Sequence, residues 1–242
     1  MAEANLADDR LIVALDYHTL DEAKQLVTTL GDAVSWYKVG MELYYSVGGE
    51  IVTWLKEQGK HVFLDLKLHD IPATVGGGLC SLMGLGADIL NVHAGGGFTM
   101  MQKAAEMVHA EAERRGIEPP KIIAVTILTS INESDWQKLG QTAPIRSVVL
   151  RLAKLTQKAG LDGVVASPQE AAFIREACGK DFLIVTPGVR PAGSSVDDQS
   201  RIATPARALQ AGASKLVIGR PIRAAADPRS AALAIIKEMQ NS

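Results

Sequence analysis

The chain has 242 residues, of which 47% are hydrophobic and 21% are charged, and its formal net charge is −2. A globular chain of this length buries about 70% of its surface on folding, so its core needs no metal or disulfide for support. The near-neutral charge excludes the strongly basic surface that holds nucleic acid by its phosphates. We therefore expect no nucleic-acid partner.

The sequence also argues against a membrane or exported protein. No apolar run approaches the roughly 18 residues of a membrane helix, and residues 1–9 are acidic, without the pattern of a signal peptide. Cys80 and Cys178 lie far apart with no CxxC spacing, which favours two buried thiols. We expect a cytoplasmic location.

Short apolar or β-branched runs recur along the whole chain and predict eight strands. They lie at 11–15, 34–39, 61–66, 88–92, 122–127, 163–166, 182–185 and 215–218. Most are continuously apolar, which is typical of parallel strands covered on both faces. Stretches with helical composition and period lie between them, at 21–30, 100–115, 145–159 and 168–177.

Eight strand–helix units without a linker predict a single (β/α)₈ TIM barrel, with residues 1–242 as one domain. A doubly wound open sheet is the alternative. No GxGxxG follows the first predicted strand and no GxxxxGK[ST] loop occurs. The glycine triplets at 76–78 and 95–97 indicate a close packing point and a turn instead.

Polar residues stand at the ends of most predicted strands. In a barrel of this kind, the carboxyl ends of the strands meet at one mouth, where active sites form. The residues concerned are Asp16, Lys38, Asp65, Lys67, Asp70, His93, Thr129, Arg190 and Arg220. Acids and bases at the first three strand ends together indicate a site.

The densest signal is the segment from Asp65 to Asp70. Side chains alternate along a strand, so Asp65 and Lys67 share a face, and Asp70 can return toward them after a turn. Flanking carboxylates hold the lysine protonated. With Lys38 they form a network of two acids and two bases, suited to delivering a proton beside a fixed negative charge. The alternatives are a structural ion-pair cluster, or a metal site of Asp65, His69 and Asp70, against which the intervening lysine argues.

The segments after the seventh and eighth predicted strands point to a phosphate. Barrels commonly bind phosphate in these loops, through backbone N–H groups and an arginine. Gly219 and Arg220 follow the eighth strand, and Arg190 follows the seventh. The sequence therefore predicts a phosphorylated small-molecule ligand. The polar loop 191–200 could close over it, although a plain surface loop is the alternative.

Several motifs, in this order, closely resemble the orotidine 5′-phosphate decarboxylase family of the bacterial type. They are DLKLHDIPAT at 65–74, NVHA at 91–94, VTILTS at 125–130, PGVRP at 187–191, DDQ at 197–199 and IGRP at 218–221. The resemblance runs from Asp16 to Arg220. The DxKxxD element is shared with sugar-phosphate relatives, whereas Lys38 and the loop ending in Gln199 distinguish the decarboxylase from those relatives.

The resemblance implies a homodimeric barrel that converts orotidine 5′-monophosphate to UMP and CO₂ without a metal or organic cofactor, the final step of pyrimidine nucleotide synthesis. It implies that Lys67 protonates C6 and that Asp65 faces the departing carboxylate. Asp16 and Lys38 resemble the pair that contacts the ribose, and Lys38 also completes the network of two acids and two bases with Asp65, Lys67 and Asp70. The remaining implied roles are ribose contacts across the dimer interface for Asp70 and Thr74, pyrimidine contacts for Thr129, Ser130 and Pro187, and phosphate or lid contacts for Arg190, Gln199, Gly219 and Arg220.

Two other functions are alternatives. One is a magnesium-dependent sugar-phosphate decarboxylase or synthase of the same suprafamily, which resembles this chain around DxKxxD. Those enzymes place a metal-binding glutamate where this sequence has Lys38. The other is a non-catalytic nucleotide-binding barrel. The loss of one of the four charged residues of the network would favour it. Lys38, Asp65, Lys67 and Asp70 are all present.

Overall fold

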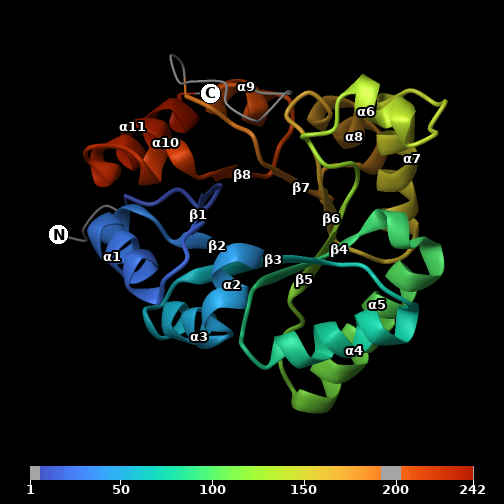
Figure 1. Cartoon of the computed structure of the whole chain (residues 1–242), viewed down its shortest axis with the longest axis horizontal. Coiled ribbons are helices and arrows are strands. Elements are labelled where there is room, and N and C mark those ends of the chain that lie inside the picture. Colours follow the sequence, from blue (N-terminus) through green and yellow to red (C-terminus); the bar gives the residue numbers. More distant parts are fainter. Residues whose placement is uncertain (1–5, 192–202, 242) are drawn as a thin grey trace.

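The computed structural model describes residues 6–191 and 203–241, and in it eight parallel strands close into a barrel in sequence order (Figure 1). The strands are β1 (Leu11–Ala14), β2 (Trp36–Gly40), β3 (His61–Leu68), β4 (Ile89–His93), β5 (Lys121–Val125), β6 (Gly163–Val165), β7 (Leu183–Thr186) and β8 (Lys215–Ile218). β1 pairs with both β2 and β8, so the sheet has no free edge. This confirms the predicted (β/α)₈ barrel and excludes the open sheet.

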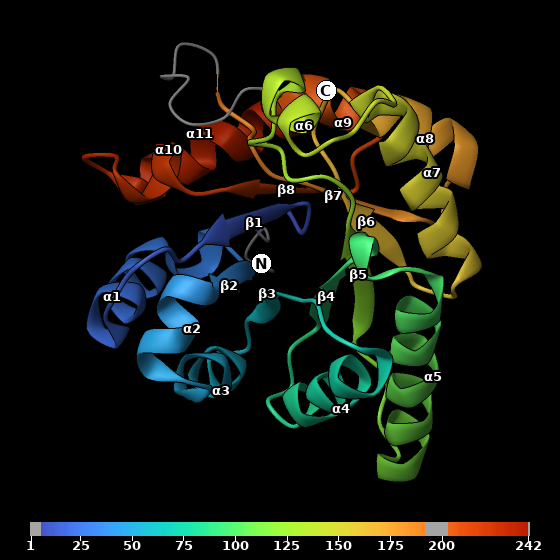
Figure 2. The ribbon, with the colours of Figure 1, turned by 45° about the vertical axis from the view of Figure 1, so that its right-hand side comes forward.

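Helices surround the strands (Figures 1 and 2). They are α1 (Leu20–Leu30), α2 (Met41–Val47), α3 (Glu50–Glu57), α4 (Pro72–Met83), α5 (Phe98–Arg115), α6 (Glu133–Lys138), α7 (Ile145–Lys158), α8 (Ala171–Cys178), α9 (Pro205–Gln210), α10 (Arg220–Arg223) and α11 (Pro228–Gln240), with 3₁₀ turns η1 (Gly31–Ala33) and η2 (Ala94–Gly96). In the described part of the chain, no helix has the length and apolar character needed to span a membrane. The last helix, α11, packs against the first, α1.

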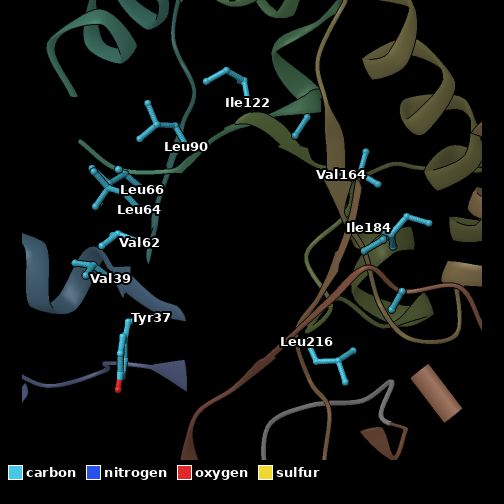
Figure 3. Packing of buried hydrophobic residues seen from close by; sticks show 14 of the residues in the cluster. Tyr37, Val39, Val62, Leu64, Leu66, Leu90, Ile122, Val164, Ile184 and Leu216 are labelled. Atoms are coloured by element: carbon cyan, nitrogen blue, oxygen red, sulfur yellow. The ribbon is translucent and has the colours of Figure 1, made fainter. Parts of the chain in front are cut away.

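The strands bury side chains on both faces, which is why they are continuously apolar. In β3, Val62 and Leu64 belong to the layer between strands and helices, and Phe63 between them belongs to the barrel interior. Figure 3 shows part of the outer layer, including Leu90 and Ile122. The interior layer contains Ile12, Ala14, Phe63, Ile89, Ile123, Val125, Val165, Val185 and Val217. Below the mouth, the barrel is therefore filled by apolar side chains.

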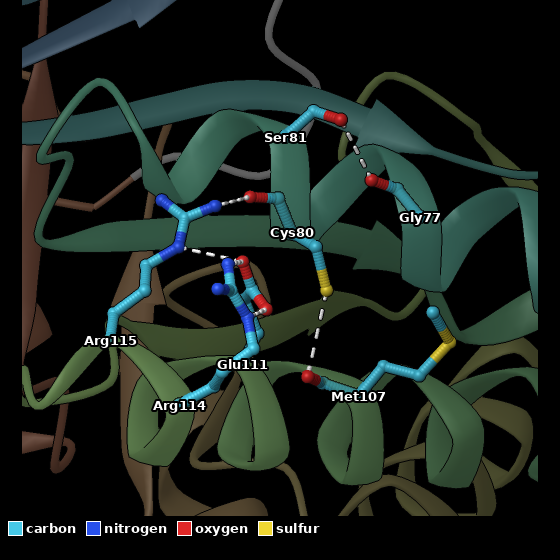
Figure 4. Close-up of polar contacts among 7 residues, drawn as sticks. All are labelled: Gly77, Cys80, Ser81, Met107, Glu111, Arg114 and Arg115. Atoms are coloured by element: carbon cyan, nitrogen blue, oxygen red, sulfur yellow. Dashed lines mark hydrogen bonds and ion pairs between the residues drawn. The ribbon is translucent and has the colours of Figure 1, made fainter.

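The glycine triplet in α4 is a close packing point, as predicted. A Cβ on Gly76 would come under 3.0 Å from the sulfur of Met107 on α5, so a larger residue there would force the Met107 side chain to move. The Cys80 thiol donates to the Met107 carbonyl at 3.5 Å, and Arg115 donates to the Cys80 carbonyl at 3.1 Å (Figure 4). Cys178 is buried as expected, whereas Cys80 is only half-buried.

Gly163 should be essential for packing at the start of β6. A Cβ there would come under 3.0 Å from both the carbonyl oxygen and the Cβ of Leu183 in β7. No side-chain rotation relieves a clash with backbone, so Gly163→Ala should lower the free energy of unfolding by about 1–3 kcal/mol. The control is Gly77→Ala, whose Cβ meets nothing within 4 Å and which should stabilise α4 by about 0.5–1 kcal/mol. Urea denaturation compares them, and equal stabilities would contradict the packing argument.

Candidate active site

A cavity of about 280 Å³ opens at the carboxyl ends of the strands. Its walls come from six strands or the segments that follow them: Lys38, Phe63, Asp65, Lys67, Val125, Ile127, Leu128, Thr129, Ser130, Val165, Pro187 and Val217. A larger hollow of about 390 Å³ lies among α6, α7 and α8. The strand-end cavity is the stronger site because it brings together charged groups from separate strands above an apolar floor.

Four charged side chains alternate in sign at this mouth. Lys38 Nζ lies 3.0 Å from Asp16 Oδ1 and 3.6 Å from Asp65 Oδ2. Lys67 Nζ lies 2.8 Å from Asp65 Oδ1. The side chains of Lys38 and Asp65 are only 12% and 11% exposed. The structure thus joins Asp16, Lys38, Asp65 and Lys67 into one array, which we call the charge array.

The inner members of the charge array keep each other ionised. Burial disfavours the carboxylate of Asp65, but the ammonium groups of Lys38 and Lys67 outweigh burial and hold its pKa below the usual value. Burial likewise disfavours the ammonium of Lys38, but Asp65 and Asp16 raise its pKa above the usual value. Around neutral pH the cavity therefore presents a fixed negative charge between two cations.

β3 keeps the predicted alternation, since Phe63, Asp65 and Lys67 all line the cavity, but its pairing with β4 is irregular. The pairing with β4 shifts between Leu64 and Leu68, because Leu64 pairs with Leu90 but Leu68 pairs with Val92. Lys67 has φ of 53°, and no other residue of the described ranges apart from glycine has positive φ. Asp65 and Lys67 therefore share the cavity face, although the backbone at Lys67 is not that of a regular strand.

Sequence reasoning assigned no role to Asn91 or Gly40. The Asn91 side chain is buried in β4, donates from Nδ2 to Asp65 Oδ1 at 2.7 Å, and accepts the Lys67 N–H at 2.8 Å. Its signal in the sequence is an amide inside an otherwise apolar strand. A Cβ on Gly40 would lie 2.9 Å from Lys38 Nζ, so this glycine leaves room for the ammonium group.

Asp70 does not join the charge array within this chain, contrary to the expectation from the turn. Its side chain is exposed and accepts the N–H of Ile71 at 2.7 Å. Thr74 is exposed on the first turn of α4. The alternative metal site of Asp65, His69 and Asp70 does not assemble either, since no three His, Cys, Asp or Glu side chains in the described ranges converge as metal ligands.

Several predicted substrate-contacting residues border the cavity. Thr129 and Pro187 line it from the segments after β5 and β7. Gly219 follows β8, and a Cβ there would lie 3.4 Å from Asp16 Oδ2. The structure thus places these three residues at the mouth.

The other predicted phosphate contacts lie farther out or are not described. Arg220 begins α10 and is exposed. Arg190 is buried beyond Pro187, and its guanidinium donates to the Val189 carbonyl at 3.1 Å. Gln199 lies outside the described residues.

Comparison with known proteins shows the family of this chain. Residues 9–235 match the orotidine 5′-phosphate decarboxylase / HUMPS family. Orotidine 5′-phosphate decarboxylase of Moorella thermoacetica is 51% identical over 97% of this chain and 93% of its own, and that of Caulobacter sp. is 50% identical over 96% and 98%. The crystal structure of orotidine 5′-phosphate decarboxylase from Lactobacillus acidophilus superposes with a TM-score of 0.84 at 41% identity, covering 96% of this chain and 99% of that one. This chain belongs to the orotidine 5′-phosphate decarboxylase / HUMPS family.

Proposed function

We propose that this protein decarboxylates orotidine 5′-monophosphate to UMP and CO₂, the final step of pyrimidine nucleotide synthesis. The observation that carries the proposal is the Lys67–Asp65 ion pair of 2.8 Å in the strand-end cavity. Relatives about half identical over nearly the whole chain bear the name of this enzyme. The proposed reaction uses no metal and no organic cofactor.

The chemistry explains why a lysine beside a carboxylate suits this reaction. When the bond from C6 to the carboxylate breaks, CO₂ leaves and the electron pair stays on C6, where the pyrimidine ring delocalises it poorly. Catalysis then depends on a cation placed where the charge develops. In our proposal the Lys67 ammonium supplies that charge and transfers its proton to C6. Asp65 faces the departing carboxylate.

Binding roles follow the walls of the cavity. We assign the pyrimidine to Thr129, Ser130 and Pro187, which line it. The ribose belongs to Asp16 and Lys38, which form an ion pair at the rim. The phosphate, remote from the bond that breaks, is assigned to Gly219, Arg220, Arg190 and Gln199. Binding energy from this distant group would hold the base in place during the reaction.

We further propose that the active unit is a homodimer in which Asp70 and Thr74 reach the partner's ribose. Asp70 is exposed and unconnected to its own charge array. Ile71 beside it is 66% exposed, and Met41, directly after the neighbouring strand β2, is 42% exposed. Apolar side chains that are exposed beside a carboxylate proposed to act in the partner's site are typical of a surface that a second copy of the chain covers. Residues 1–242 would form one domain per subunit, since β1 pairs with β8.

The magnesium-dependent alternative is not favoured. The ammonium of Lys38 stands 3.6 Å from Asp65 Oδ2, where it would repel a divalent cation. A non-catalytic barrel would have no need for the paired, buried charges of the array, which are costly to desolvate.

A turnover assay tests the function directly. Purified protein should consume orotidine 5′-monophosphate, seen as loss of substrate absorbance, at the same rate with and without EDTA. Abolition by EDTA would support the magnesium-dependent alternative. If the substrate is not consumed, calorimetry with UMP separates a nucleotide-binding barrel, which binds UMP, from a sugar-phosphate enzyme, which does not.

A further inference from the structure

We propose that Asn91 is a positioning residue that holds Asp65 and Lys67 in their reactive arrangement. The inference rests on the proposed decarboxylase function, because the two residues it positions are the proposed reacting groups. Asn91 itself lies behind them on β4 and is 2% exposed. It is not among the residues that line the cavity.

The chemistry of its two partners fixes the orientation of the amide. The Lys67 backbone N–H can only donate, so it requires the amide oxygen, which lies 2.8 Å away. The ionised carboxylate of Asp65 can only accept, so it requires the amide nitrogen, which lies 2.7 Å away. A single buried side chain therefore ties the backbone of one proposed reacting residue to the side chain of the other.

Lys67 needs such a tie because of its backbone. A left-handed conformation costs a residue other than glycine roughly 1–2 kcal/mol, and Lys67 adopts it at φ 53°. Leu64 and Leu68 pair with β4 on either side of the irregular turn, and between their partners on β4 only Asn91 remains. In a regular parallel pair, a backbone carbonyl of β4 would accept the Lys67 N–H. Here the register is shifted, and the amide oxygen of Asn91 accepts this N–H instead.

The same amide restrains Asp65. Asp65 Oδ1 receives both Asn91 Nδ2 and Lys67 Nζ, and Oδ2 faces Lys38 at 3.6 Å. Without the amide, the carboxylate can rotate about its χ2 angle and exchange its two cations. Its position beside the departing group of the substrate would then be lost, although all four charges of the array remain.

The prediction is a loss of turnover without an equal loss of binding. Asn91→Leu keeps the branched shape of the side chain and removes both hydrogen bonds. We expect kcat to fall about 100-fold, the effect of misplacing a reacting group by about 1 Å. KM should change little, because the base and phosphate contacts come from the segments after β5, β7 and β8.

The pH dependence of kcat in Asn91→Asp distinguishes a positioning role from a merely structural one, which would leave it unchanged. It keeps the acceptor for the Lys67 N–H but sets a second carboxyl group against Asp65 Oδ1. Lys38, Lys67, Asp65 and His93 are the titratable groups around this position. When protonated, the new carboxyl can donate to Asp65 as the amide does. Relative to the parent, kcat of this variant should therefore rise as pH falls.

The control is Leu90→Ala in the same strand. Leu90 is fully buried in the outer apolar layer, so its truncation should lower the melting temperature and leave kcat near the parental value. Parental kcat in Asn91→Leu, or a pH-independent ratio in Asn91→Asp, would overturn the inference. A parent without turnover would instead overturn the proposed function. Crystal structures of the variants then decide: Lys67 should leave its left-handed turn in Asn91→Leu, and an unchanged charge array would overturn the positioning role.

Discussion

Lys67→Ala should reduce kcat for orotidine 5′-monophosphate by at least about 10³-fold, since it removes both a general acid and the cation facing the developing charge. Binding of UMP should persist, because the proposed pyrimidine and phosphate contacts lie on other elements. Steady-state turnover and calorimetry with UMP measure the two effects separately. This separation is expected only if Lys67 acts on the reacting carbon.

Lys121→Ala is the matched control for Lys67→Ala. Lys121 also lies on a strand and pairs with an aspartate at 2.8 Å, but its side chain is 58% exposed. Exposed pairs of this kind contribute about 0–1 kcal/mol to stability, so this variant should keep parental turnover. If Lys67→Ala stayed within about tenfold of the parent, corresponding to roughly 1.4 kcal/mol, its role as proton donor would be wrong.

Mixing two inactive variants should restore activity if Asp70 acts across a dimer interface. Lys67→Ala and Asp70→Ala homodimers would each lack a functional site. In a mixed dimer, one site combines both defects and the other is intact. Random co-assembly should therefore recover about a quarter of parental turnover, since half of the dimers of a two-fold symmetric protein are mixed.

The control for this experiment is a mixture of Lys67→Ala with Asp65→Ala. Asp65 and Lys67 pair within one chain, so every mixed dimer has a defect in both sites and no activity should return. If the mixture of Lys67→Ala with Asp70→Ala also regained no activity, Asp70 would act in the site of its own chain. Co-expression with two different purification tags isolates the mixed dimers, and because one of their two sites is intact, the doubly purified fraction should show about half of parental turnover.

The barrel could be predicted because parallel strands buried on both faces leave continuous apolar runs, and each of the eight runs overlaps an observed strand. The helices were harder to predict from the sequence. The sequence of α4 contains three consecutive glycines, which disfavour a helix, yet packing of Gly76 against α5 overrides this propensity. The predicted helix 168–177 begins instead at Ala171, since the Glu170 side chain accepts the Ser167 N–H and holds the preceding turn.

The charged members of the site could be predicted because ionisable residues at strand ends converge in a barrel. The local geometry of β3 could not, since strand periodicity carries no information about a register shift. Alternation assigned Asp65 and Lys67 to one face, and both line the cavity, but it did not predict the left-handed turn at Lys67 or the hydrogen bond from the Lys67 N–H to the Asn91 side chain. Asp70 was misplaced for a similar reason, since the turn carries its side chain to the surface.

The pairing of Leu11 in β1 with Leu216 in β8 sets the order in which this molecule can finish folding. During synthesis from the amino end, β1 to β7 can associate as an open sheet whose outermost strands each have an unpaired edge. Such edges are templates for association with other chains, and contacts between residues so distant in sequence form late. Completion therefore waits for the last strand to leave the ribosome, and a nascent chain is most prone to aggregate just before it does.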